Sequence, residues 1–264
     1  MPLSEFRTVP IEDFDMGRVV SRTFETIGRN APAFLALAIL AVIPQLVLAA
    51  VLGVGTGMRP NQIDPSKIFH MYGLMMVVGL ASMIFSAILQ AALVHGTISD
   101  LNGNKASFGD CLGTGIRTCL PVIGLTIVFS VAIFFGFILL IVPGVMLSIA
   151  WAVVVPVLVV EKTGVFATFG RSAELTKGHR WKIFGLYLAI AVLSMVLGFA
   201  ILPLSSAMTT ANEGLLAMAP VMALQGVVKV VVATISAAGV AAVYYELRAA
   251  KEGIGPEQLA SVFD

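Results

Sequence analysis

Charged residues are scarce in this sequence. Lys, Arg, Asp and Glu make up only 12% of its 264 residues, whereas hydrophobic residues make up 58% and the mean hydropathy is +0.98. A soluble domain carries about 25% charged residues, which cover its surface. The scarcity therefore excludes an ordinary soluble domain and predicts a membrane protein with several spans. Because the net charge is only +1, no bulk attraction to nucleic acid exists and no nucleic-acid partner is expected.

Residues that commonly carry out catalysis are also few. The chain has two cysteines and three histidines, and no metal-binding, phosphate-binding or nucleophile motif. Cys111 and Cys119 would lie about 12 Å apart on one helix, too far for a disulfide, which favours small buried apolar side chains. The best enzymatic hypothesis uses His179, Glu161 and Glu174 on a lipid headgroup, but solvated surface charges explain the same residues. We therefore expect no enzyme activity, cofactor or metal.

What the sequence has instead is long apolar runs. A span of about 20 residues crosses a hydrocarbon core of about 30 Å, and six runs approach or exceed that length: Phe34–Val54, Met71–Ile98, Pro121–Ile141, Val145–Val160, Ile183–Leu204 and Met218–Tyr245. A tight turn is expected at 142–144, and Pro156 should interrupt the fourth run. The predicted fold is an all-α polytopic membrane protein with six transmembrane helices arranged as three hairpins.

Three segments between these runs show amphipathic spacing. Polar and apolar residues alternate with the 3.6-residue helical period over Met16–Arg29, Phe108–Arg117 and Gly164–Lys177. Each segment predicts a cytoplasmic interfacial helix that precedes a hairpin, and Gly178 should end the third one. We expect one membrane domain over residues 1–264, divided as a tail with a surface helix (1–30), hairpin 1 (33–98), surface helix and hairpin 2 (108–160), surface helix and hairpin 3 (164–246) and a cytoplasmic tail (247–264).

This order of elements suggests an internal repeat. A surface helix followed by two spans occurs three times, and Phe108-Gly109 matches Phe169-Gly170. Short matches in apolar sequence also arise by chance. Units with two spans keep the same membrane orientation, so the repeats would be parallel, and the inverted repeats of many transporters fit poorly.

Lysine and arginine are distributed unequally between the loops. Thirteen of the sixteen fall on one side of the predicted spans, two fall on the other, and Lys229 falls within a span. The positive-inside rule therefore places both termini and the three surface helices in the cytoplasm.

Six of these cations form the predicted site for anionic lipid. Near an anionic leaflet each cation contributes about 1 kcal/mol to membrane attraction. The candidates for lipid contact are Arg22, Arg29, Arg171, Lys177, Arg180 and Lys182. Ordinary positive-inside topology would produce some of this enrichment without any specific site.

Lys229 is the one cation inside a predicted span. A charge at the bilayer centre costs about 2.5 to 3.5 kcal/mol on insertion scales, so this side chain needs an outlet. It either extends to the outer headgroups or lies in a water-lined cavity or against a buried partner. Its expected partners in such an intramembrane polar site are Gln225, Gln45 and Gln90. Gln90 alone is also explained as an interfacial polar residue.

Two stretches carry a resemblance to a known family. They read RSAELTKGHRWKIFG at Arg171–Gly185, preceded by Glu161 and Gly164, and YYELRAAKEG at Tyr244–Gly253. They resemble the bacterial family named for the membrane domain of glycerophosphoryl diester phosphodiesterase, together with related integral membrane proteins of unknown activity. The resemblance implies a multi-span fold. In the family's enzymes catalysis resides in a separate soluble barrel, which this sequence lacks, so phosphodiesterase activity is not expected.

The leading functional expectation is a non-enzymatic protein of the bacterial inner membrane. It would organise or sense the anionic inner leaflet or support a membrane partner, because surface helices and interfacial cations dominate the polar sequence. Its expected partners are membrane lipids and a membrane protein or a second copy of the chain. The alternative is a transporter or channel for a small solute or lipid built around Lys229.

Overall fold

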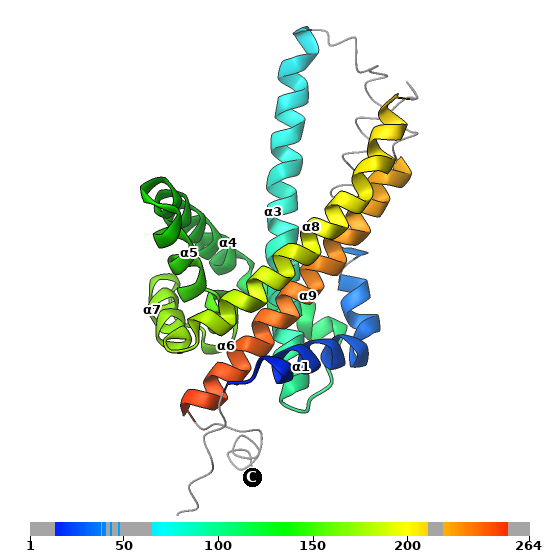
Figure 1. Ribbon diagram of the computed structural model, residues 1–264. Helices are drawn as coiled ribbons and strands as arrows, with labels where there is room; N and C mark the ends of the chain where they lie inside the picture. Colours follow the sequence, from blue (N-terminus) through cyan, green and yellow to red (C-terminus); the bar gives the residue numbers. More distant parts are fainter. Residues whose placement is uncertain are drawn as a thin grey trace, which may run out of the picture.

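The computed structural model describes residues 14–37, 39–40, 43, 47, 65–210 and 219–252, and these are helical apart from short connections (Figure 1). The helices are α1 (Met16–Arg29), α3 (Pro65–Leu101), α4 (Phe108–Leu139), α5 (Ile141–Ala150), α6 (Val154–Glu161), α7 (Val165–Thr176), α8 (Arg180–Thr210) and α9 (Ala219–Glu252). In Figure 1, α8 and α9 lie side by side and α9 crosses α3, while α1 runs across the lower end of α9.

Five helical segments are long and apolar enough to cross a membrane, which indicates a multi-pass membrane protein. They are Tyr72–Leu101, Phe108–Leu139, Ile141–Glu161, Arg180–Ala200 and Leu224–Glu252. Each corresponds to one of the six predicted runs. The remaining predicted span, Phe34–Val54, lies mostly outside the described residues, although Phe34 and Leu37 at its start are buried.

Helix α4 differs from the prediction of a separate surface helix at Phe108–Arg117. Ser107 begins the helix by accepting a hydrogen bond from the Asp110 amide at 3.1 Å, and the helix then continues past Pro121 to Leu139. Gly115 serves close packing, and the helix continues through it. A Cβ at Gly115 would lie only 2.6 Å from the Ile88 carbonyl oxygen of α3, so α3 and α4 approach backbone to backbone.

The connection between α4 and α5 lies at Leu140, before the predicted turn at 142–144. Pro143 instead occupies the first turn of α5, where its missing amide hydrogen leaves no helical bond unmade. The turn is short because two glycines meet across it. A Cβ on Gly136 would lie 3.2 Å from Gly144 Cα, and one on Gly144 would lie 2.9 Å from the Phe137 ring.

Helices α5 and α6 form one discontinuous segment. The interruption was expected at Pro156, but it lies before that residue. Residues 151–153 make a turn, and Pro156 lies in the first turn of α6. Proline removes the hydrogen bond to the carbonyl four residues earlier, which here belongs to Ala152. The interruption is therefore upstream of Pro156 itself.

Candidate functional site

Helices α1 and α7 meet the C-terminal ends of α3, α6 and α9 (Figure 1). Charged side chains gather in this region, which we call the charged end. Three groups of carboxylates lie there: Glu161 with Glu252, Glu246 alone, and Asp100 alone. Each group is bound by an arginine from α1 or α7. The ion pairs of the charged end therefore connect α1 and α7 to the ends of candidate spans.

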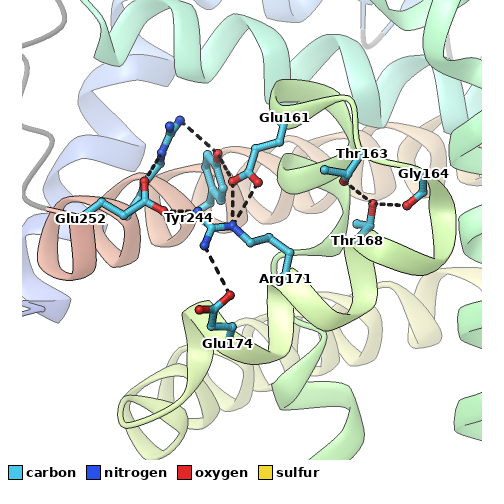
Figure 2. A network of polar contacts seen from close by, with 9 residues as sticks. Glu161, Thr163, Gly164, Thr168, Arg171, Glu174, Tyr244 and Glu252 are labelled. Atoms are coloured by element: carbon cyan, nitrogen blue, oxygen red, sulfur yellow. Dashed lines mark hydrogen bonds and ion pairs between the residues drawn. The ribbon is translucent and has the colours of Figure 1, made fainter.

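Arg171 of α7 lies between carboxylates from two other helices (Figure 2). Its Nε donates to Glu161 Oε2 of α6 at 3.0 Å, and its Nη2 forms an ion pair with Glu252 Oε1 of α9. The Tyr244 hydroxyl of α9 donates to Glu161 Oε1 at 3.0 Å. One arginine thus joins α6, α7 and α9.

The surroundings of Arg171 stabilise the charged form of its guanidinium. Partial burial lowers the pKa of the guanidinium, but its hydrogen bonds to Glu252 and Glu161 outweigh that effect and hold the pKa above its ordinary value. Arg248 also donates to Glu252, from Nε to Oε2 at 2.7 Å. Two arginines therefore share the Glu252 carboxylate.

Glu246 is the most deeply buried carboxylate of the charged end, with a side chain only 3% exposed. Arg18 Nη2 lies 3.2 Å from its Oε2, and Arg22 Nη1 pairs with its Oε1. The Arg22 guanidinium also lies over the Tyr245 ring, 5.2 Å from the centroid. Because a buried carboxylate is costly unless it is paired, these arginines hold α1 against α9.

Asp100, in the last turn of α3, binds a second part of α1. Its carboxylate accepts hydrogen bonds from Thr26 Oγ1 at 2.8 Å, from Asn30 Nδ2 at 2.8 Å and from Arg29 Nε at 3.2 Å. Its side chain is 8% exposed. The hydrogen bond to Asp100 also raises the pKa of the Arg29 guanidinium.

Hydroxyl groups of α7 bind the backbone groups that the interruption between α5 and α6 sets free. Ser172 Oγ and Thr176 Oγ1 donate to the Ala150 carbonyl at 3.0 and 3.1 Å, and the Val153 amide donates to Ser172 Oγ at 3.3 Å. Both hydroxyl side chains are fully buried. Unpaired backbone groups at membrane depth are costly, so α7 is an integral part of the fold at this point.

Tyr187 of α8 binds the other freed carbonyl. Its hydroxyl donates to the Ala152 carbonyl at 2.9 Å, the group that Pro156 leaves without its helical partner. α7 and α8 together therefore complete the hydrogen bonding of the discontinuous segment.

The six cations predicted to contact anionic lipid have different surroundings. Arg22, Arg29 and Arg171 are in the ion pairs described above, and Lys182 Nζ donates to the Phe14 carbonyl at 2.8 Å. The side chains of Lys177 and Arg180 form no hydrogen bond or ion pair with any described residue. These two are the predicted contacts whose charge is left for a ligand.

Arg180 borders an apolar groove between α5 and α8 with a volume of about 370 Å³. Val145, Met146 and Phe184 are among its lining side chains, and Trp181 stands at its edge with 85% of its surface exposed. Arg180 Nε is buried and has no hydrogen-bond partner among the described residues. The groove thus combines apolar walls with one cation.

The residues of the predicted intramembrane polar site are only partly brought together. Gln90 of α3 lines a cavity between α3, α6, α8 and α9, together with Ser236 of α9. Lys229 and Gln225 are exposed on α9 and do not line that cavity. Gln45 lies outside the described residues.

The residues of the enzymatic hypothesis do not form a group of their own. Glu161 is bound by Arg171 and Tyr244, so its interpretation as a solvated surface charge is wrong. Glu174 is 69% exposed, and the His179 ring packs against Phe14 with centroids 5.3 Å apart. Among the residues that the structure describes, no three His, Cys, Asp or Glu side chains are close enough to hold a metal ion.

Sequence reasoning missed the buried hydroxyl groups of α7. Thr168, Ser172 and Thr176 repeat at intervals of four residues, so they lie on one helix face, and all three are fully buried. A stripe of small hydroxyl residues beside a proline-interrupted span is the signal that could have identified them.

Comparison with known protein families, with curated proteins and with solved structures finds no match to this chain. The two stretches that carry the family resemblance meet in the structure, because Arg171 of the first binds Glu252 of the second.

Proposed function

We propose that this protein is a non-enzymatic integral membrane protein that binds anionic phospholipid in the cytoplasmic leaflet of a bacterial inner membrane. The observation that carries the proposal is the groove between α5 and α8, with Arg180 as its one cationic lining residue. A lipid acyl chain matches the apolar walls, and a phosphate matches the buried Nε of Arg180, which has no hydrogen-bond partner in the described part of the chain.

The division among the cations supports this choice of site. Arginines that bind carboxylates of the protein are neutralised locally, so they attract lipid headgroups weakly. Lys177 and Arg180 have no such carboxylate in the described chain, and Trp181 beside them suits the headgroup region of a bilayer. Lipid specificity is therefore assigned to these two cations more than to Arg22, Arg29 or Arg171.

The remaining cations and carboxylates have a structural role in this proposal. The charged end joins α1 and α7 to the spans on the cytoplasmic side, as the positive-inside distribution predicts. The six-span arrangement, the family relationship and a membrane-protein or self-association partner belong to the same proposal.

Native mass spectrometry of the full chain tests lipid binding. Protein released from detergent that contains equal phosphatidylglycerol and phosphatidylcholine should retain phosphatidylglycerol preferentially. Lys177→Ala with Arg180→Ala should remove the preference, whereas Arg117→Ala, which removes an exposed cation of α4 away from the groove, should preserve it. Equal retention of the two lipids by the unmodified protein would refute the proposal.

A second candidate function is transport of a small solute or lipid through the polar region of α9. Gln225, Lys229 and Ala233 follow one another at intervals of four residues, so they share a helix face, and Ala233 lines the cavity that holds Gln90. The Lys229 side chain forms no hydrogen bond or ion pair with described residues. Solute flux in proteoliposomes that is lost in Lys229→Met would favour this function over the first.

A further inference from the structure

A cavity of about 370 Å³ lies between α3, α6, α8 and α9. Its polar lining residues are Ser86, Gln90, Tyr187 and Ser236, and its other walls are aliphatic. Gln90 and Tyr187 are also exposed at the surface of the helical bundle. Since this surface belongs to candidate membrane spans, the cavity opens toward lipid.

Three of these polar side chains have no partner in the part of the chain that the structure describes. Ser86, Gln90 and Ser236 form no hydrogen bond with any described residue, although other hydroxyls on the same helices bind their own backbone, as Thr97 and Thr234 do. A side-chain amide without a hydrogen-bond partner costs several kcal/mol in hydrocarbon, as an unpaired backbone group does. The cavity therefore requires a hydrogen-bonding occupant.

The Tyr187 hydroxyl contributes a hydrogen-bond acceptor to the cavity, because its hydrogen is used at the interruption between α5 and α6. Tyr187 uses its hydrogen to bind the Ala152 carbonyl at 2.9 Å, so its oxygen remains able to accept a hydrogen bond. The Gln90 amide and the two serine hydroxyls both donate and accept. An occupant with hydroxyl and carbonyl groups would match this set.

The chemistry and the depth of the cavity both oppose a charged occupant. None of its lining residues is ionisable at neutral pH. Gln90 precedes the end of α3 at Leu101 by about 16 Å of helix rise, which is about half the thickness of the hydrocarbon core. An ionised or zwitterionic headgroup at this depth would lose its hydration without gaining a counter-charge.

We propose that this cavity binds an uncharged lipid with hydroxyl and ester carbonyl groups in its head, of the diacylglycerol type. The head binds Gln90, Ser236 and Ser86, and the acyl chains leave through the open side of the cavity. This site is separate from the Arg180 groove and requires neither anionic-lipid binding nor transport, although it uses the cavity of the second candidate function.

Photo-crosslinking of the full chain in phosphatidylcholine nanodiscs tests the proposal. The probes are a diacylglycerol and a phosphatidylglycerol, each with a diazirine near the glycerol end of one acyl chain, and labelled peptides are mapped by mass spectrometry. The diacylglycerol probe should label residues around Val94 and Val155, and unlabelled dioleoylglycerol should compete. Gln90→Leu with Ser236→Ala should lower this labelling about tenfold, as expected for the loss of about one hydrogen-bond pair.

Two comparisons make the outcome decisive. Ser194→Ala removes a hydroxyl that binds its own helix at Ile190 and should leave labelling unchanged, as should Arg180→Ala, which disrupts only the proposed anionic-lipid site. If Gln90→Leu unfolds the protein, Ser86→Ala with Ser236→Ala removes the hydroxyls without added bulk and should still reduce labelling. Equal labelling of the cavity by phosphatidylglycerol, or undiminished diacylglycerol labelling in folded variants, would overturn the inference.

Discussion

Arg171 and Glu252 form an ion pair across 81 positions of sequence, between the middle of α7 and the last turn of α9. Glu161, bound at Nε of the same guanidinium, extends the contact to α6. The C-terminal end of α6 is therefore joined through Arg171 to the C-terminal end of α9. Local sequence patterns predict helices, but this contact determines how three of them are held together.

The Arg171 cluster should contribute measurably to stability. Arg171→Ala leaves Glu161 and Glu252 without that guanidinium, and it should lower the free energy of unfolding by about 2 kcal/mol, as expected for charged hydrogen bonds that are partly screened. Arg171→Lys should recover only part of the loss, because one ammonium cannot span both carboxylates. Thermal unfolding in detergent, followed by size-exclusion fluorescence, measures both. Arg117→Ala serves as the exposed control, and a comparable loss in that variant would argue against the cluster.

Arg29 allows an internal comparison of two carboxylates. Asp100 has an 8% exposed side chain, whereas Glu25 is 57% exposed and lies 3.7 Å from Arg29. Asp100→Asn should destabilise the protein by about 2 kcal/mol because three donors lose a charged acceptor. Glu25→Gln should cost less than about 0.5 kcal/mol, since exposed ion pairs contribute little. Equal decreases in the melting temperature would contradict this assignment.

The hydroxyl groups of α7 should stabilise the interrupted span. Ser172→Ala with Thr176→Val leaves the Ala150 carbonyl and the Val153 amide without their side-chain partners. Each unpaired buried group costs about 1 to 3 kcal/mol, so the double variant should show a large decrease in melting temperature. Ser194→Ala, whose hydroxyl binds only its own helix, should have almost no effect. Hydrogen exchange should also accelerate at residues 150–153 in the double variant alone.

Two glycines of α4 should respond oppositely to alanine. A Cβ at Gly115 meets the Ile88 carbonyl oxygen at 2.6 Å, whereas a Cβ at Gly124 meets nothing within 4 Å. Gly115→Ala should therefore force α3 and α4 apart and reduce the yield of folded protein. Gly124→Ala should be neutral or stabilise the helix by up to about 1 kcal/mol through helix propensity. A harmless Gly115→Ala would show that α3 and α4 are not in such close contact.

The sequence was sufficient for features that depend on local spacing. The bounds of α1 match the predicted Met16–Arg29, and α7 ends next to Gly178, which adopts a φ of +95° that favours glycine. The apolar runs also coincide with the five described candidate spans. These features follow from helical periodicity and from the length needed to cross a bilayer.

Other features depend on contacts that no local pattern contains. Nothing near Arg171 in the sequence indicates Glu252 as a partner, and nothing near Gly115 indicates that Ile88 lies against it. The predicted surface helix at Phe108–Arg117 was wrong as a separate element, because the helix continues to Leu139 and Gly115 within it packs against α3. The six cations were predicted to form one lipid site, but protein carboxylates bind three of them.

Membrane topology tests the central claim, that the charged end lies in the cytoplasm at the inner leaflet. Reporter fusions after Asp100 and Lys162 should report inside, and fusions after Val54, Val142 and Glu213 should report outside. An inside result at Val142 would make α4 and α5 a re-entrant hairpin and end the six-span arrangement. An outside result at Lys162 would place α7 and Arg180 away from the cytoplasmic leaflet and contradict the account as a whole.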